Sequence, residues 1–153
     1  MTKQRMVVIL AVATAVLVSL GALRADSDDA QTLHGSFIAT VQTPTRTLKA
    51  TYTFSPGGGV VETNLNPAGA TVVSHGSWVR TGERQFVFVL WFLGQTPADP
   101  NSSFVRQKAR ELITLDPSGN SYTSAIQLSL FDANGNLIGS PQGSALATRI
   151  TTD

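Results

Sequence analysis

The amino-acid sequence predicts an all-β protein, an eight-stranded antiparallel up-and-down β-barrel that follows an N-terminal signal peptide. Short runs rich in β-branched and aromatic residues are separated by turn signals such as "SPGGG", "DPSGN" and "DANGN", the pattern of an antiparallel all-β domain. The Asp/Asn–Gly turns favour hairpins between consecutive strands. No convincing helix follows the signal peptide. A two-sheet β-sandwich fits the same strand pattern and stays the alternative.

The predicted strands alternate in character, as expected of a sheet with one dry and one wet face. In the run 46–54, Leu48, Ala50, Tyr52 and Phe54 share one face, and Lys49 lies among threonines on the other. Eight such strands close into a barrel whose interior holds side chains or one ligand. The eight runs are 37–43, 46–54, 60–64, 71–80, 85–93, 104–115, 121–131 and a last strand ending in 144–150.

The first 25 residues have the features of an export signal. Lys3 and Arg5 precede the charge-free apolar run "MVVILAVATAVLVSL", and small residues follow in "GALRA", which is the order that signal peptidase recognises. The expected division is a signal peptide at 1–25, a flexible acidic leader at 26–33 and one barrel domain at 34–153. We therefore expect a periplasmic or extracellular protein without a membrane segment after cleavage; an uncleaved N-terminal anchor is the alternative.

Charge and composition exclude several partners. All 10 acidic residues but only 8 of the 11 basic residues follow residue 25, so the mature chain carries a net charge of about −2. A nucleic-acid partner is therefore not expected, because such proteins present clustered Lys and Arg. The absence of cysteine excludes a lipoprotein anchor and leaves the domain to be held by its core alone.

The run 85–93, "QFVFVLWFL", is apolar on both faces. Only one face can point into a barrel, so the face with Val87, Val89 and Trp91 needs another cover. That cover is either a segment of the same chain or a second copy, and the second interpretation predicts a homo-oligomer formed through these three residues.

The tetrapeptide "HGSF" at 34–37 returns as "HGSW" at 75–78, and the two copies contain the only histidines of the chain. On the predicted order these copies belong to the first and fourth strands, about 14 Å apart at about 4.8 Å per strand. Two imidazoles that share a zinc ion each lie about 2.1 Å from it, so a shared metal site is not expected, and neither is a cofactor. The favoured role is structural: the glycine lets the strand bend and the aromatic residue fills the interior.

The first-strand copy also resembles a calycin feature. Lipocalins and related calycins carry Gly-x-Trp on the first strand, with an arginine from the last strand packed on the ring; here Gly35, Phe37 and Arg149 occupy these places, with Phe in place of Trp. The segments "HGSWVRTGERQFVF", "ITLDPSGNSYTS", "FDANGN" and "ATRI" resemble an uncharacterised family of small exported bacterial β-barrel proteins. Both resemblances imply the barrel; neither implies a particular activity.

Two glutamates inside predicted strands are candidate catalytic residues. Glu62 and Glu111 would need partners if buried, and a buried carboxyl group suggests function. A surface position is nevertheless the favoured prediction for both.

The direction in which the charged side chains of the run 104–115 point depends on which face of this strand is turned inward. With Ile113 and Leu115 inward, Arg106, Lys108 and Arg110 face solvent, which is the favoured arrangement. The opposite orientation would line the interior with cations.

Three functions are compatible with these features. The leading hypothesis is an exported barrel that binds a small apolar ligand inside; the first alternative is a cyclase or isomerase without a classical triad, which would resemble allene oxide cyclases and dirigent proteins. The second alternative is a self-assembling structural module with a solid core, and whether the protein is an enzyme stays open. The predicted lining residues are Phe37, Tyr52, Trp78, Phe86 and Phe88.

Overall fold

The structure is a computed structural model that describes residues 32–65, 69–93 and 106–152 of the chain. The predicted signal peptide and most of the predicted leader therefore lie outside the described residues. No helix in the described ranges is long and apolar enough to span a membrane. The strands are β1 (Gly35–Gln42), β2 (Thr47–Phe54), β3 (Gly59–Leu65), β4 (Thr71–Arg80), β5 (Gln85–Leu93), β6 (Arg106–Leu115), β7 (Ser121–Phe131), β8 (Leu137–Gly139) and β9 (Gln142–Arg149).

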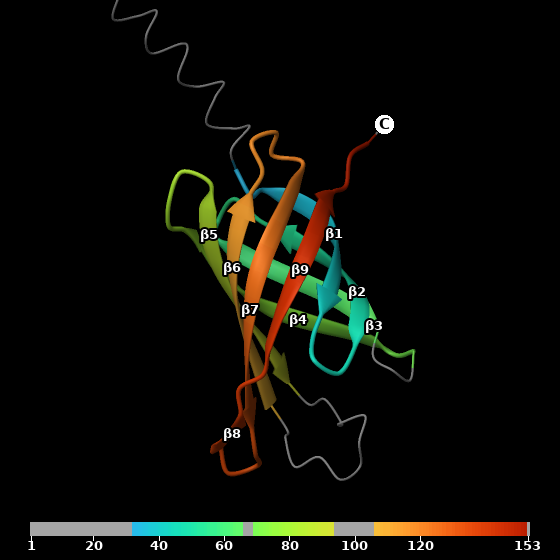
Figure 1. Ribbon diagram of the computed structural model, residues 1–153, viewed down its shortest axis with the longest axis vertical. Coiled ribbons are helices and arrows are strands. Elements are labelled where there is room, and N and C mark those ends of the chain that lie inside the picture. Colours follow the sequence, from blue (N-terminus) through green and yellow to red (C-terminus); the bar gives the residue numbers. More distant parts are fainter. Residues whose placement is uncertain (1–31, 66–68, 94–105, 153) are drawn as a thin grey trace, which may run out of the picture. The chain divides into compact units, whose positions relative to one another are not determined.

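The strands form one closed antiparallel barrel (Figure 1). Each strand from β1 to β7 pairs with the next, β9 pairs with both β7 and β1, and this closes a barrel of eight strands. The predicted barrel is confirmed and the sandwich alternative is wrong. The ninth strand, β8, was not predicted as a separate strand; its three residues pair with the end of β7, beyond the part of β7 that pairs with β9.

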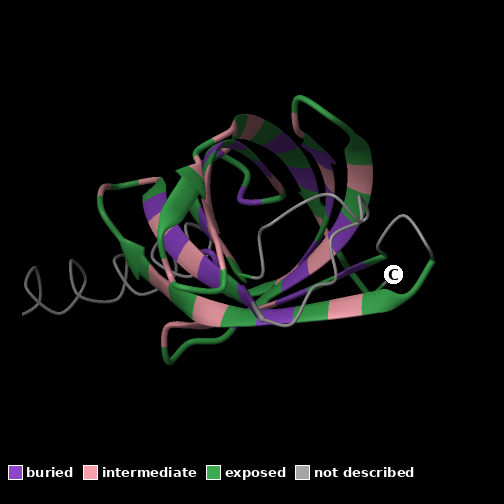
Figure 2. Ribbon diagram, turned by 90° about the horizontal axis from the view of Figure 1, so that it is seen from below, coloured by how far each residue is buried: buried purple, intermediate pink, exposed green. Residues whose placement is uncertain are grey.

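Alternation of side chains places the core inside the barrel, and Figure 2 shows buried and exposed residues alternating along the strands. On β2, Ala50, Tyr52 and Phe54 are buried while Lys49 and Thr53 are exposed. The predicted faces of this strand are confirmed. Burial of this one face supplies the hydrophobic free energy that fixes the register, because a slip of one residue would turn the whole set to solvent.

Strand β6 has the orientation that the sequence favours, with its three cations on the outer face. Ile113 and Leu115 are buried, whereas Arg106 and Arg110 are exposed. Lys108 points outward and lies with its Nζ atom 5.7 Å from the centre of the Trp91 ring. The three cations of β6 are therefore on the outer face.

Strand β5 buries one of its two apolar faces, as expected. Phe86, Phe88, Leu90 and Phe92 are buried in the core. On the outer face, Trp91 is 40% exposed and its ring stacks on that of Phe131 with a centroid distance of 5.8 Å. Residues of the same chain thus cover part of this face; self-association through Val87, Val89 and Trp91 stays a prediction.

The glycines of the repeated tetrapeptide allow close approaches that a side chain would block. A Cβ atom on Gly76 would lie 1.7 Å from the carbonyl oxygen of Val89 on the neighbouring strand. Gly35 has a φ of 106°, a conformation that L side chains rarely adopt. The bending role expected for these glycines agrees with both observations.

The two copies of the tetrapeptide meet at one end of the barrel, although their strands are not neighbours. The His34 ring, just before β1, contacts the Trp78 ring edge-on with a centroid distance of 5.5 Å. Leu33, which was expected in the leader, is completely buried in the core. Arg149 lies over the Phe37 ring, with Cζ 4.5 Å from the ring centre, so the contact implied by the calycin resemblance is present.

Candidate functional site

The interior near the β2–β3, β4–β5 and β6–β7 turns is filled by aromatic rings. Phe54 is at their centre, and its ring contacts five others at centroid distances of 5.5 to 6.4 Å. Such edge-to-face and stacked pairs add to the free energy of area burial. We refer to this region as the packed half, defined by Leu33, Phe37, Phe54, Trp78, Phe86 and Tyr122.

All five predicted lining residues point into the barrel. Phe37, Trp78 and Phe86 belong to the packed half, where rings contact rings. The rings of Tyr52 and Phe88 contact each other with a centroid distance of 5.5 Å and lie further along the barrel axis. Phe88 is paired in register with Glu111, and Tyr52 donates a hydrogen bond to it. Contact of these five residues with a ligand stays a prediction.

Glu62 and Glu111 are both buried inside the barrel, with exposed fractions of 3% and 2%. The favoured surface position was therefore wrong for both. The sequence contained the signal: Glu62 shares a face with Val60 and Asn64, and Glu111 shares one with Ile113. We call these glutamates with Tyr52, Ser74 and Ser124 the carboxyl layer, which adjoins the packed half.

Glu111 receives hydrogen bonds from two neighbouring hydroxyl groups. Ser124 Oγ lies 2.7 Å from Oε2, and Tyr52 donates to Oε1 over 3.2 Å. Burial, together with the nearby Glu62 charge, raises the pKa of Glu111 to about 8, although the hydrogen bonds from the two hydroxyl groups act in the opposite direction. This carboxyl group is therefore largely protonated at neutral pH.

Glu62 has one satisfied and one free oxygen. The Asn64 amide donates to Oε1 over 2.6 Å, whereas Oε2 has no hydrogen-bond partner. Burial raises its pKa to about 7, and the Asn64 amide, the Ser74 hydroxyl and the Arg46 charge counteract part of this. Glu62 is thus poised to gain or lose a proton near neutral pH.

Two further buried oxygens near this layer also lack partners. Ser74 is paired in register with Glu62 and is completely buried. Its hydroxyl is close enough to lower the pKa of Glu62, but the contact does not have the geometry of a normal hydrogen bond. The Tyr122 hydroxyl is likewise unpartnered, and burial keeps its pKa well above 10, with the charges of Glu111 and Glu62 adding to the effect. Buried polar atoms are normally hydrogen-bonded, so three such oxygens indicate an occupant such as water or a ligand.

Beyond the carboxyl layer, toward the ends of β1, β3 and β5, the wall includes several small residues. Ala50, Ala109 and Ala145 are buried there, and Gly143 approaches the Gln42 carbonyl so closely that a Cβ atom would lie 2.5 Å from its oxygen. Larger apolar side chains at this level come from several strands, such as Val41 of β1, Leu90 of β5 and Ile126 of β7. We call this region the alanine half, defined by Ala50, Ala109, Gly143 and Ala145 with the half-buried Leu48, Val72 and Leu128.

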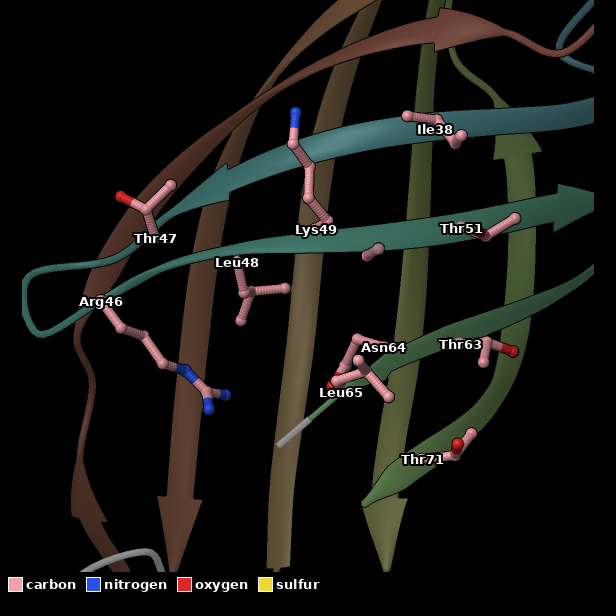
Figure 3. A pocket seen from close by; sticks show the side chains of 11 residues that line it. Ile38, Arg46, Thr47, Leu48, Lys49, Thr51, Thr63, Asn64, Leu65 and Thr71 are labelled. Atoms are coloured by element: carbon pink, nitrogen blue, oxygen red, sulfur yellow. The ribbon is translucent and has the colours of Figure 1, made fainter. Parts of the chain in front are cut away.

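An open depression of about 810 Å³ lies at the same end of the barrel. It spreads over β1 to β4 and combines outward residues such as Thr51 with Leu48 and Asn64 (Figure 3). Arg46 and Leu48 point from the β1–β2 connection to the side where Asn64 lies, and Lys49 points away. Arg46 is therefore the cation placed beside the alanine half.

Other candidate chemistry does not assemble. His75 is exposed on β4, while His34 lies against Trp78 of the packed half. The described residues contain no group of three or more metal-ligating His, Cys, Asp or Glu side chains. In "DANGN", Asp132 accepts hydrogen bonds from the backbone and side chain of Asn136 at 2.8 and 3.0 Å. These bonds close a hairpin turn, as expected.

Comparison with known proteins identifies the fold. No family model and no curated protein matches the chain, so membership of the bacterial or calycin families stays a prediction. The solved structure of EF1p2_mFAP2b bound to DFHBI is similar, with a TM-score of 0.61 and 17% identity, over 81% of this chain and 99% of that one.

Two designed barrels are also similar, to a lesser degree. The redesigned β-barrel b11L5F_LGL has a TM-score of 0.54 and 15% identity, over 82% of this chain and 96% of its own. A de novo designed fluorescence-activating β-barrel has a TM-score of 0.51 and 13% identity, over 80% of this chain and 98% of its own. At these identities the likeness shows the fold alone, which is the β-barrel.

Proposed function

We propose that this protein binds a small, largely apolar molecule in the alanine half of the barrel, with the carboxyl layer as the floor of the site. One observation carries the proposal: Glu62 Oε2, Ser74 Oγ and Tyr122 Oη are buried without partners where the packed half ends. An unpaired buried polar group costs about 1–3 kcal/mol. Such a cost at three neighbouring interior positions is expected where a bound molecule supplies the missing partners.

The composition of the two halves supports the same location. The packed half has its interior filled by rings that contact one another, whereas the wall of the alanine half includes several small residues. Ligand sites combine apolar walls with a few polar groups that orient the ligand, and they occur in the mouths of β-barrels. The similar barrel EF1p2_mFAP2b is bound to DFHBI, and the de novo designed barrel is fluorescence-activating; these properties belong to those proteins and support the proposal by analogy of fold.

Native mass spectrometry of protein purified without detergent tests this function. We expect a mass excess that disappears on denaturation, together with a released small molecule. A bare protein at the calculated mass that also fails to increase DFHBI fluorescence would contradict the proposal. A bare protein that forms a stable dimer or larger assembly would favour the structural module instead.

Acid–base catalysis is a second candidate, and Glu111 favours it. A carboxyl group whose pKa is raised to about 8, and which is held by Tyr52 and Ser124, is suited to transfer a proton near neutral pH. The molecule released above would be returned to the wild-type protein and to Glu111→Gln and followed by chromatography. Conversion to an isomer by the wild type alone would support an isomerase, and an unchanged compound would support a carrier.

A further inference from the structure

We propose that the ligand of this barrel is an apolar amine, bound as its ammonium ion against Glu62 with the oxygens of Ser74 and Tyr122 nearby. This inference rests on the proposed function and adds the chemical class of the ligand. It starts from the geometry of the carboxyl layer, where two carboxyl groups from β3 and β6 face the same interior.

The unpartnered groups are all oxygens. An ammonium group presents up to three N–H donors and no acceptor. The free atoms in and next to the layer are one carboxyl oxygen, which only accepts when it is ionised, and the hydroxyl oxygens of Ser74 and Tyr122, which accept as well as donate. The side-chain N–H donor that reaches this layer, the Asn64 amide, is already bonded to Glu62. A ligand N–H group can therefore bond to each of these oxygens, and the oxygen of an ionised Glu62 requires such a donor.

The charge of the layer points to the same class. Glu62 and Glu111 are the carboxyl groups among the buried side chains of the described ranges. Because the pKa of Glu111 is raised to about 8 and that of Glu62 to about 7, Glu62 is the one that ionises more readily near neutral pH. Tyr52 and Tyr122, which face them from β2 and β7, have pKa values held well above 10 and stay neutral. Buried charge is normally paired with an opposite charge, and a ligand cation would supply it here.

Arg46 is the cation that acts on Glu62 within the chain. Its charge lowers the pKa of Glu62, but this effect is smaller than that of burial and of the hydrogen-bonding neighbours. Arg46 is exposed beside the alanine half, so its guanidinium stays hydrated and leaves Glu62 Oε2 free. Positive charge near Glu62 thus already favours the ionised carboxylate, and a desolvated ammonium would do so more strongly.

The pH dependence follows from this arrangement. A bound cation favours the ionised carboxylate, so amine binding releases a proton wherever Glu62 is protonated in the free protein. Because burial raises the pKa of Glu62 to about 7, affinity should fall by about tenfold for each pH unit below 7. A neutral ligand that accepts a hydrogen bond from the protonated acid would show the opposite trend.

The experiment compares two probes of nearly the same shape, 2-(aminomethyl)naphthalene and 2-(hydroxymethyl)naphthalene, by fluorescence titration of the full protein at pH 8.5 and pH 5.5. We expect the amine to bind at least tenfold more tightly than the alcohol at pH 8.5, with the preference lost at pH 5.5. Glu62→Gln should abolish the preference at pH 8.5. The matched control is Glu83→Gln, which makes the same change at an exposed glutamate of the β4–β5 turn and should leave the preference intact.

The outcomes separate this inference from the proposed function. Equal binding of amine and alcohol at pH 8.5, or a preference that survives Glu62→Gln in protein shown to be folded by circular dichroism, would overturn the amine assignment and leave ligand binding in place. Failure of both probes to bind would count against the proposed function itself. Arg46→Gln adds a second readout, because removal of the competing charge should tighten amine binding and leave alcohol binding unchanged.

Discussion

The packed half and the alanine half are built by the same eight strands with the same alternation, yet they differ in how the interior is used. In the packed half, the Phe54 ring contacts five other rings. Hydrogen bonds also connect the chain segments at this end of the barrel. Trp78 donates to the Ser55 carbonyl over 3.0 Å, and Arg149 donates to the carbonyls of Gly119 and His34.

The alanine half has small wall residues and no comparable ring cluster among the residues that the structure describes. The β1–β2 and β6–β7 ladders run through both halves in unbroken register, so the pairing of these strands does not distinguish the halves. The difference shows that the size of the inward residue at each strand position decides which end of the barrel supplies stability. The other end is then free to accept a ligand.

Substitutions in the two halves should therefore have unequal effects on stability. Phe54→Ala should lower the free energy of unfolding by about 3–5 kcal/mol, because it leaves a cavity among five rings. Leu48→Ala, on the same strand and the same face but half-buried, should lower it by roughly 1–2 kcal/mol. Urea denaturation of both variants measures the difference, and equal losses would show that the alanine half is packed as tightly as the other.

The carboxyl layer makes stability depend on pH in an unusual direction. Burial raises the pKa of Glu62 to about 7 and that of Glu111 to about 8, from an ordinary value of 4.5. The folded protein therefore holds these protons where the unfolded chain has released them. The stability from each group is fully present below about pH 4.5 and is lost as the pH rises through about 7 to 8.

For Glu62 the expected loss is on the order of 3 kcal/mol across this window. The double variant Glu62→Gln with Glu111→Gln should remove most of the pH dependence and should be more stable than the wild type at pH 8.5. Thermal unfolding from pH 4.5 to 8.5 measures it, with Glu83→Gln as the surface control. A wild-type stability that is constant or increases over this range would contradict the burial of ionisable carboxyl groups in the core.

The barrel and its faces could be predicted from the sequence because alternation and turn chemistry are local signals. The Asp/Asn–Gly turns indicate which strands are neighbours. The alternation of apolar and polar residues in strands such as 46–54 indicates which side chains point inward, and neither signal requires contacts with distant parts of the chain. β8 was missed because its three residues pair only with the end of β7. Likewise, the contact of His34 with Trp78 depends on how the chain crosses the barrel end, which strand order does not report.

The site was only partly predictable. Glu62 and Glu111 were recognised as candidates, but a general preference of glutamate for the surface outweighed the local alternation. The orientation favoured for β6, with Ile113 and Leu115 inward, also turns Glu111 inward, so the two expectations were incompatible. The partners Tyr52, Ser74 and Ser124 come from other strands, and no pattern along the chain brings them together.

The smallest expected effect on stability concerns the alanine half directly. Ala109→Leu adds three carbon atoms to the inner wall, whereas Ala125→Leu makes the same change on the outer face of the adjacent strand β7. If the alanine half has room for a ligand, Ala109→Leu should cost less than about 1 kcal/mol, because overpacking of a filled core costs typically 1–3 kcal/mol. It should at the same time abolish binding of DFHBI or of the naphthalene probes, while Ala125→Leu leaves binding unchanged. Urea denaturation and fluorescence titration on the same samples decide the matter: a large loss of stability would indicate a solid interior, and retained binding would place the ligand outside the alanine half.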